Sequence, residues 1–262
     1  MKLGFVGTGA IAEAVIVGML EAKAFEGQII VSRRSEPRSQ MLSQRFENVQ
    51  VESDNQKIVD QSDWVFISVL PAQAEALLRD LNFRREQFVI SMVAGRSLAS
   101  LAQLVAPVSN VFRIIPLPPI EHGIGPLPIT PPNDDIAALF DHFGTSVQVD
   151  DEDQFSAFSA SSALMASFYE LVASQARWIE SQGVPAPQAT KYATAILHSL
   201  AETTVNKSPE GLQAMAKECL TIGGLNEQVL KESLADGWFN QMDQRLDRIA
   251  DRLAKAKESG SV

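Results

Sequence analysis

The chain has 262 residues, enough for one large domain or two of ordinary size. Its formal net charge is −10, and such an acidic surface repels phosphate backbones, so we expect no nucleic-acid partner. One cysteine excludes an internal disulfide and a cysteine-rich zinc site, and the chain shows neither a signal peptide nor an apolar run that could span a membrane, so we expect a cytoplasmic protein.

Short apolar runs alternate with longer amphipathic segments, such as 10–22 and 73–80, from residue 2 to about 150. Several runs are rich in Val, Ile and Phe and are largely uninterrupted, as in strands buried on both faces of a parallel sheet. The alternation predicts a doubly wound α/β sheet in a first domain, 1–150. The predicted strands are 3–6, 28–32, 49–51, 64–69, 88–93, 110–115, 126–130 and 146–149.

A glycine fingerprint, G-x-G-x-x-A, stands directly after the first strand and opens the first helix. In a dinucleotide-binding turn Gly7 allows the tight bend, Gly9 lets a pyrophosphate approach the backbone, and Ala12 lets the helix pack close to the strand. The pyrophosphate then lies on the helix N-terminus, where free N–H groups favour negative charge. We therefore predict cofactor contacts from Gly7, Thr8, Gly9, Ala10, Ile11 and Ala12.

The second strand ends in Ser32, Arg33 and Arg34, where NAD-specific sites usually carry an Asp or Glu for the ribose 2′-hydroxyl. A carboxylate would repel a 2′-phosphate, whereas a hydroxyl and guanidinium groups bind it by charge-assisted hydrogen bonds. The sequence therefore predicts NADP(H) rather than NAD. The alternative is a solvated basic loop without a ligand.

The carboxyl ends of the fourth and fifth strands complete the predicted crevice. Ligands of open α/β sheets bind at these strand ends. Pro71 also suits the first position of the following helix, because no N–H is needed there. We expect the wall of the cofactor site to include Val69, Leu70, Pro71, Ala94 and Gly95.

The spacing of apolar residues changes after residue 150, where a helical periodicity replaces the short apolar runs typical of strands. We predict an all-helical second domain, 151–262, that begins with one long helix over 152–182 and ends it at Gly183. Much of 155–182 is apolar or small on several faces, which favours burial against a partner subunit. The further helices are expected at 186–205, 209–220, 226–235 and 238–257.

The stretch "TIGGLNEQ", 221–228, places two adjacent glycines between predicted helices. Each would cost about 1 kcal/mol relative to alanine in a helix interior. They mark either a simple loop or a place where a ligand approaches the backbone. Asn226 and Glu227 follow at a helix start, where capping and ligand binding are both open and can coexist.

The three histidines are scattered and form no metal-ligand pattern. His122 follows a proline-rich turn near the expected cofactor edge, so it is a candidate proton donor, with an ordinary loop histidine as the alternative. Ser161 and Ser162 could donate to a substrate carboxylate, or they could allow close helix packing. No catalytic residue is assigned.

Six segments together resemble the pyrroline-5-carboxylate reductase family over nearly the whole chain. They are "GFVGTGAIAEAVIVG", "VFISVLPAQ", "VISMVAGRSLASL", "RIIPLPPIEHGIGP", "SAFSASSA" and "TIGGLNEQ". The resemblance implies a Rossmann-type domain followed by a helical dimerisation domain. It also implies a homodimer or larger assembly, and hydride transfer from NAD(P)H to the C=N bond of a cyclic imino acid, giving proline.

Carried onto this sequence, the resemblance adds Pro116 to the cofactor site and implies substrate contacts from Ser161, Ser162, Gly223, Gly224, Leu225 and Asn226. The chain departs from the family pattern at several of these places. Leu117 and Pro118 replace an Asn-Thr pair, and Leu225 and Asn226 replace two threonines. The scaffold and cofactor site are thus retained, whereas the substrate pocket is lined differently.

The leading hypothesis is therefore an NADPH-dependent imine reductase acting on pyrroline-5-carboxylate or a close analogue. A reductase of another ketimine or of a 2-oxo acid on the same scaffold is the alternative among enzymes, and an NADP-binding regulatory protein without turnover is the alternative outside them. A β-hydroxyacid dehydrogenase is disfavoured, because it would need a lysine on the first long helix after the sheet and 152–182 contains none.

Overall fold

The computed structural model describes residues 1–207 and 211–259. It divides into two compact units, one formed by Met1–Ala160 with Ile249–Val262 and the other by Ser161–Arg248. The boundary predicted near residue 150 falls before this division, and the assignment of all of 151–262 to one second domain stays a prediction. The first part of the predicted helical region belongs to the first unit.

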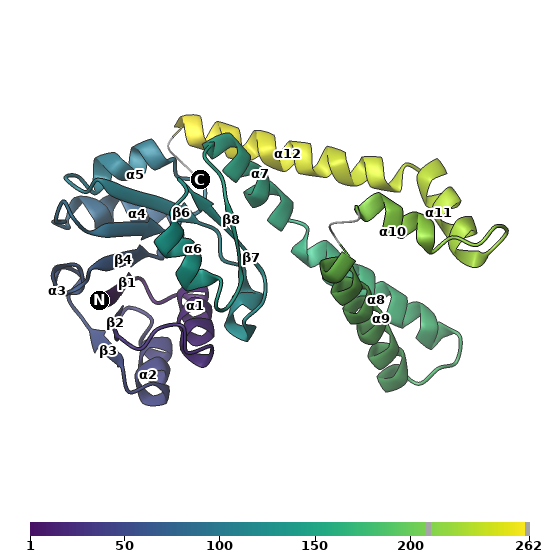
Figure 1. Cartoon of the computed structure of the whole chain (residues 1–262), viewed down its shortest axis with the longest axis horizontal. Helices are drawn as coiled ribbons and strands as arrows, with labels where there is room; N and C mark the ends of the chain where they lie inside the picture. Colours follow the sequence, from purple (N-terminus) through teal and green to yellow (C-terminus); the bar gives the residue numbers. More distant parts are fainter. Residues whose placement is uncertain (208–210, 260–262) are drawn as a thin grey trace. The chain divides into compact units, whose positions relative to one another are not determined.

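The first unit is built on one eight-stranded sheet with the order β3-β2-β1-β4-β5-β6-β7-β8 (Figure 1). Neighbouring strands are parallel except for β6 and β7, which are antiparallel. The doubly wound prediction is confirmed, and the antiparallel pair was not foreseen. The strands are β1 Lys2–Val6, β2 Gln28–Ser32, β3 Val49–Glu52, β4 Trp64–Ile67, β5 Phe88–Ser91, β6 Asn110–Ile114, β7 Pro126–Thr130 and β8 Thr145–Gln148.

Helices cover both faces of this sheet, because alternate strand residues point to opposite sides. Leu3 and Phe5 of β1 belong to one apolar cluster, and Val6 belongs to the other. The first cluster includes residues of α1 Ala10–Glu21, α2 Glu36–Arg45 and α6 Asp134–Phe140. The second includes residues of α3 Asn55–Gln61, α4 Pro71–Arg79 and α5 Leu98–Leu104.

Helix α1 also packs against η1, a 3-10 helix over Pro118–His122. The contact depends on Gly18, because a Cβ there would lie 2.1 Å from the carbonyl oxygen of Ile120. The close approach fixes the proline-rich segment after β6 onto the helix whose N-terminus follows the glycine fingerprint. The sequence placed this segment in a loop and gave no sign of its anchor.

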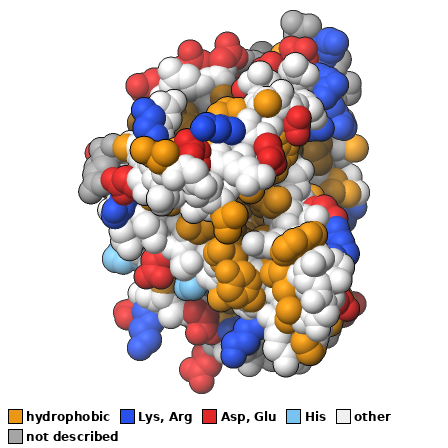
Figure 2. Space-filling view, turned by 90° about the vertical axis from the view of Figure 1, so that its right-hand side faces the viewer, with side chains coloured by type: hydrophobic (Ala, Val, Ile, Leu, Met, Phe, Trp, Pro, Cys, Tyr) orange, Lys and Arg blue, Asp and Glu red, His pale blue; other side chains and the backbone are white. Residues whose placement is uncertain are grey.

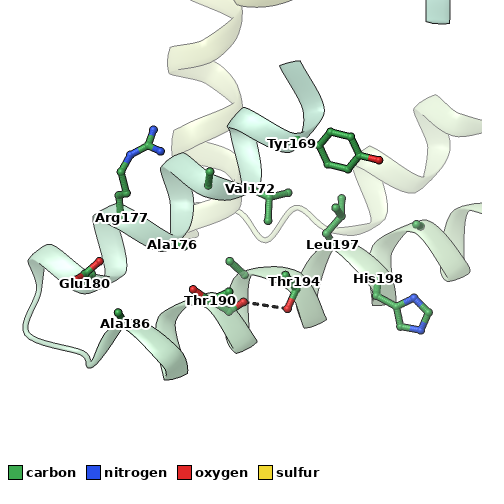
Figure 3. A pocket seen from close by; sticks show the side chains of 13 residues that line it. Tyr169, Val172, Ala176, Arg177, Glu180, Ala186, Thr190, Thr194, Leu197 and His198 are labelled. Atoms are coloured by element: carbon green, nitrogen blue, oxygen red, sulfur yellow. Dashed lines mark hydrogen bonds between the residues drawn. The ribbon is translucent and has the colours of Figure 1, made fainter. Parts of the chain in front are cut away.

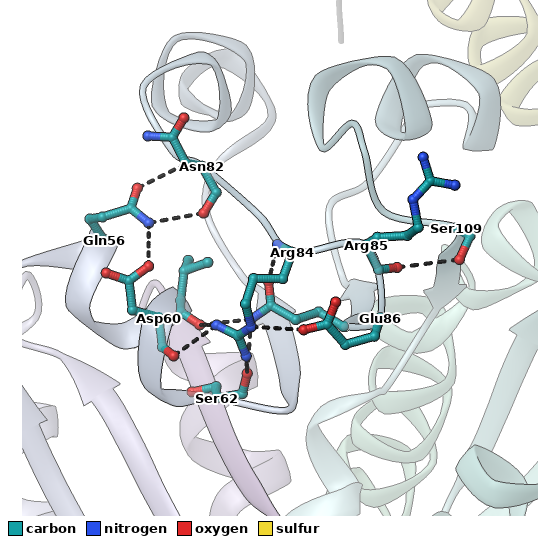
Figure 4. A network of polar contacts seen from close by, with 10 residues as sticks. Gln56, Asp60, Ser62, Asn82, Arg84, Arg85, Glu86 and Ser109 are labelled. Atoms are coloured by element: carbon teal, nitrogen blue, oxygen red, sulfur yellow. Dashed lines mark hydrogen bonds and ion pairs between the residues drawn. The ribbon is translucent and has the colours of Figure 1, made fainter.

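A polar clamp closes the end of α3 that lies near the start of β4 (Figure 4). The guanidinium of Arg84 donates to the carbonyl oxygens of Asp60 at 2.7 Å and Ser62 at 3.0 Å. The amide of Gln87 donates to Val59 O at 2.7 Å and Ser62 O at 2.8 Å. These donors satisfy carbonyls that the helix end leaves without partners. They therefore strengthen the edge opposite the strand ends that form the crevice.

After Gln148 the described part of the chain forms helices and no further strand. The single helix predicted over 152–182 is wrong, because α7 ends at Ser162 and α8 begins at Met165. Leu164 N bonds to Ser161 O three residues back, a tighter 3-10-type turn that follows a serine-rich stretch. The helices are α7 Glu152–Ser162, α8 Met165–Ser181, α9 Ala186–Lys207, α10 Leu212–Glu218, α11 Leu225–Ala235 and α12 Trp238–Ser259. The first residues of the helix predicted over 209–220 lie outside the described residues.

The second unit has almost no core of its own. Ala189 and Ala193 of α9 are its only buried residues within the described part of 161–248. Large apolar side chains are exposed instead, for example Tyr169, Trp178 and Leu200 at 65%, 65% and 55%. Figure 2 shows apolar side chains gathered on one face of the molecule. Over the residues that the structure describes, every helix is too short or too polar to cross a membrane.

Candidate cofactor-binding site

The turn after β1 is held in its shape by the strand beside it. Gly7 has φ +97°, and a Cβ there would lie 2.2 Å from the carbonyl oxygen of Ser68 at the end of β4. Only glycine fits both the backbone conformation and this close approach. The turn opens into a pocket of about 400 Å³. Its lining is Gly7, Thr8, Gly9, Ala10, Ile11, Arg34, Ser35, Ser68, Val69, Leu70, Gln73 and Met92.

The N-terminus of α1 faces this pocket with the features that a pyrophosphate needs. Gly9 is the N-cap, and a Cβ on it would have only one neighbour, at 4.0 Å, so its backbone is open to a ligand. No side chain caps the helix, which leaves the first amide groups for an anion. Ala12, on the buried face of α1, is fully buried, which fits close packing of this helix. The residues present therefore fit a dinucleotide pyrophosphate.

The three residues at the end of β2 have different surroundings. Ser32 is 2% exposed and takes part in hydrogen bonds with the glycine turn. The Arg33 guanidinium bonds to Glu36 at 2.7 Å on the surface and is not among the pocket-lining residues. Arg34 and its neighbour Ser35 do line the pocket. One of the two arginines predicted to bind the 2′-phosphate thus lines the pocket, and the phosphate contact itself stays a prediction.

The strand ends supply the opposite wall, in part as predicted. Val69 and Leu70 line the pocket, whereas Pro71 is the first residue of α4 and is not among the lining residues. Ala94, Gly95 and Pro116 are not among the lining residues, and Pro116 is buried. Ser35, Ser68, Gln73 and Met92 line the pocket and were missed by the sequence reading. Ser68 and Met92 directly follow β4 and β5, so the strand-end rule could have found them.

A buried ion pair ties the β6 end of the sheet to the start of α7. Arg113, 6% exposed, donates to Glu152 at 2.6 Å and lies over the ring of Phe155 at 4.7 Å. The same oxygen of Glu152 accepts the amide N–H of Leu98 at 2.6 Å, at the start of α5. Burial lowers the pKa of Arg113, and the Glu152 carboxylate opposes that shift. An arginine inside a buried strand requires such a partner, but the sequence does not say which.

The glycine pair lies in a turn that caps α11. Gly223 has φ +73° and Gly224 is the N-cap. The Glu227 carboxylate accepts the Gly223 amide at 2.7 Å, and the Asn226 side chain donates to Cys219 O at 3.1 Å. The capping alternative therefore describes the local geometry. Leu225 is 83% exposed at the same turn. A substrate contact from these residues stays a prediction.

The remaining candidate polar residues, Ser161, Ser162 and His122, do not line the pocket. Ser161 is exposed and Ser162 half-buried at the end of α7. His122 lies on the surface, 3.7 Å from Glu121, and is not among the pocket-lining residues. Among the described residues no three His, Cys, Asp or Glu side chains are placed to hold a metal ion. Proton donation by His122 stays a prediction.

Comparison with known proteins gives several pyrroline-5-carboxylate reductases among the relatives. A family model described as "NADP oxidoreductase coenzyme F420-dependent" matches residues 2–95. The pyrroline-5-carboxylate reductase of Corynebacterium melassecola is 30% identical over 133 residues, 49% of this chain and 49% of the relative. That of Escherichia coli strain K12 is 24% identical over 202 residues, 73% of this chain and 75% of the relative. The chain spans about half the length of the first curated relatives it matches.

Solved structures match over nearly the whole chain. The 1-pyrroline-5-carboxylate reductase of Streptococcus pyogenes has a TM-score of 0.82 at 25% identity, covering 98% of each chain. The Plasmodium falciparum pyrroline carboxylate reductase, with NADP bound, has a TM-score of 0.82 at 18% identity and covers 100% of this chain and 98% of the other. The second likeness concerns the fold alone. Together with the sequence matches, these likenesses relate the chain to pyrroline-5-carboxylate reductases at modest identity.

Proposed function

We propose that the chain binds NADPH and reduces the C=N bond of a cyclic imino acid, pyrroline-5-carboxylate or a close analogue. The observation that carries the proposal is the pocket at the glycine turn, which combines an open helix N-terminus with Arg34. Among the relatives, the NADP-bound Plasmodium structure supports the choice of nucleotide. The similarity to pyrroline-5-carboxylate reductases supports the reaction.

The protein's part in this reaction is to hold and orient the two reactants. The bound nucleotide would supply the hydride, and the amide groups at the start of α1 would hold its pyrophosphate. Arg34 has no ion-pair partner among the described residues, so its charge is available to a 2′-phosphate. Ser35 offers a hydroxyl beside it in the pocket lining. Val69 and Leu70 would exclude water from the opposite wall.

The substrate contacts proposed for Ser161, Ser162, Gly223, Gly224, Leu225 and Asn226 rest on the family resemblance. The surroundings of the glycine pair favour an imine with more apolar surface than pyrroline-5-carboxylate as a second candidate substrate. Ile222 and Leu225 flank the pair and are 98% and 83% exposed. A site built from such side chains has fewer hydroxyl donors for a carboxylate and more area for an apolar ring.

We also infer that the chain acts as a homodimer through its helical unit. A groove of about 640 Å³ runs between α8 and α9, with Val172 and Ala176 on one side and Ala193 and Leu197 on the other (Figure 3). Monomeric proteins rarely expose apolar surface of this extent. A second copy would cover it, in the reducing cytoplasm that the single cysteine fits.

Absorbance loss of NADPH is the direct test of the activity. The purified protein is incubated with NADPH and, in turn, pyrroline-5-carboxylate, larger cyclic imines and 2-oxo acids. Turnover with the imines supports the proposal, and the preferred ring size selects between the two candidate substrates. Turnover with 2-oxo acids alone would contradict an imine reductase, and tight NADPH binding without any turnover would indicate a regulatory protein.

Light scattering tests the assembly in the same preparation. We expect a mass at or above that of two chains of 28.5 kDa. The variant Leu197→Glu tests the interface, because it places a charge in the groove between α8 and α9. It is expected to shift the mass toward that of one chain. A wild-type protein that is monomeric at tens of micromolar would contradict the dimer.

A further inference from the structure

We propose that Ser32 is a positioning residue that holds the glycine turn, and that its hydroxyl does not bind the 2′-phosphate. The inference rests on the proposed nucleotide-binding function and corrects the role predicted for Ser32. In this arrangement the discrimination between NADPH and NADH comes from Arg34 and Ser35 instead.

Three residues, Gly7, Thr8 and Ser32, form a short chain of hydrogen bonds at the end of β2. Gly7 N donates to Ser32 Oγ at 3.0 Å, and Thr8 Oγ1 donates to the backbone oxygen of Ser32 at 2.7 Å. The two hydroxyl oxygens are 3.2 Å apart, close enough for a third bond. Thr8 and Ser32 are 1% and 2% exposed, so these bonds do not compete with bulk water.

The direction of the third bond follows from the number of hydrogens. A hydroxyl carries one hydrogen, and that of Thr8 is already given to the Ser32 carbonyl. The hydrogen between the two hydroxyls therefore comes from Ser32. The chain runs from the Gly7 amide to the Ser32 hydroxyl, then to the Thr8 hydroxyl, and ends on the Ser32 carbonyl.

This direction leaves Ser32 without a donor for a phosphate. Phosphate oxygens at neutral pH accept hydrogen bonds, so a residue that binds them must donate. Ser32 could do so only by giving up its bond to Thr8. It is also absent from the pocket lining, which contains Arg34 and Ser35. Successive bonds in one direction reinforce each other, so the chain braces Gly7 in the φ +97° conformation.

Nucleotide affinities separate bracing from phosphate recognition. Dissociation constants for NADPH and for NADH are measured by fluorescence titration on the wild type and on Ser32→Ala, Thr8→Val and Arg34→Ala. Ser32→Ala is expected to weaken both nucleotides by a similar factor, roughly 5- to 50-fold, because the Gly7 amide loses its acceptor. Arg34→Ala is expected to weaken NADPH by at least about tenfold and to leave NADH nearly unchanged.

Thr8→Val removes the other hydroxyl with little change of shape and should again affect both nucleotides alike. Combined with Ser32→Ala, it should add little, because both changes break one chain. Ser62→Ala is the matched control, since Ser62 is a fully buried serine that bonds to a carbonyl, Ile58 O, away from the pocket. Its effect is expected on thermal stability only, so both affinities should stay at the wild-type values.

A loss confined to NADPH in Ser32→Ala would show that Ser32 binds the phosphate, and unchanged affinities for both nucleotides would show that it braces nothing. Hydrogen exchange of the Gly7 amide in the nucleotide-free protein gives an independent readout. Ser32→Ala should accelerate that exchange by about tenfold or more, and an unchanged rate would overturn the inference. Wild-type protein that binds neither nucleotide would refute the proposed function, while the exchange rate would still decide the role of Ser32.

Discussion

Removing the Glu152 carboxylate should destabilise the first unit far more than removing a carboxylate from a surface ion pair. Glu152→Ala leaves the Arg113 charge without its counter-ion in a site where the arginine side chain is 7% exposed. Breaking a buried pair costs about 3–5 kcal/mol, and the 20% exposure of Glu152 places this one at the lower end. The Leu98 amide also loses its acceptor. We expect a loss of about 3 kcal/mol.

Thermal unfolding of a chain of this size converts that loss into a fall in Tm of about 6–12 °C. Glu86→Ala is the matched control, because Glu86 pairs with Arg84 at 3.1 Å but is 73% exposed, and its removal should change Tm by about 1 °C or less. The double variant Arg113→Met, Glu152→Ala removes both charges and keeps an apolar side chain near Phe155. It should recover at least half of the lost stability.

The reasoning would be refuted if Glu152→Ala melted at the temperature of Glu86→Ala, or if the double variant were less stable than Glu152→Ala alone. NADPH affinity gives a second check. Neither Arg113 nor Glu152 lines the pocket, so the dissociation constants of the folded variants should match the wild type.

Two further predictions concern glycines. Gly18→Ala should lower Tm, because the added methyl would lie 2.1 Å from Ile120 O and overpacking costs about 1–3 kcal/mol. Helix propensity alone would raise the stability by about 1 kcal/mol. A higher Tm would therefore contradict the close contact. The pKa of Glu227 is lowered by its bond to Lys231 and then by the Gly223 amide. The capping turn is therefore favoured above the ordinary pKa of a glutamate and lost as pH falls through the lowered value. Carboxyl NMR should show Glu227 titrating below the ordinary pKa of a glutamate, and a pKa that is not lowered would contradict the cap.

The cofactor side of the fold could be read from the sequence because its signals are local. The glycine fingerprint needs its residues at fixed spacing after a strand, and Gly7 and Gly9 lie where that spacing predicts. The uninterrupted apolar runs likewise predicted a sheet covered on both faces, because strands that are buried on both sides carry apolar residues at nearly every position.

The features that the sequence did not predict depend on contacts between residues that are distant in the sequence. Ser32 fits a phosphate ligand by its type and position, but its hydrogen-bond partner Thr8 lies 24 residues earlier, where no local pattern points to it. The partner of Arg113 is 39 residues away, and no local pattern selects Glu152. The break between α7 and α8 contains no glycine or proline, so helical spacing alone carried the prediction through it.

The two units differ in how far each could exist alone. The sheet unit has an apolar layer on each face and therefore carries a core of its own. The helical unit has two buried alanines and a surface rich in large apolar groups. Expressed by itself, Ser161–Arg248 would have to aggregate or melt. The fold of the helical unit therefore depends on the surface that covers its exposed apolar side chains.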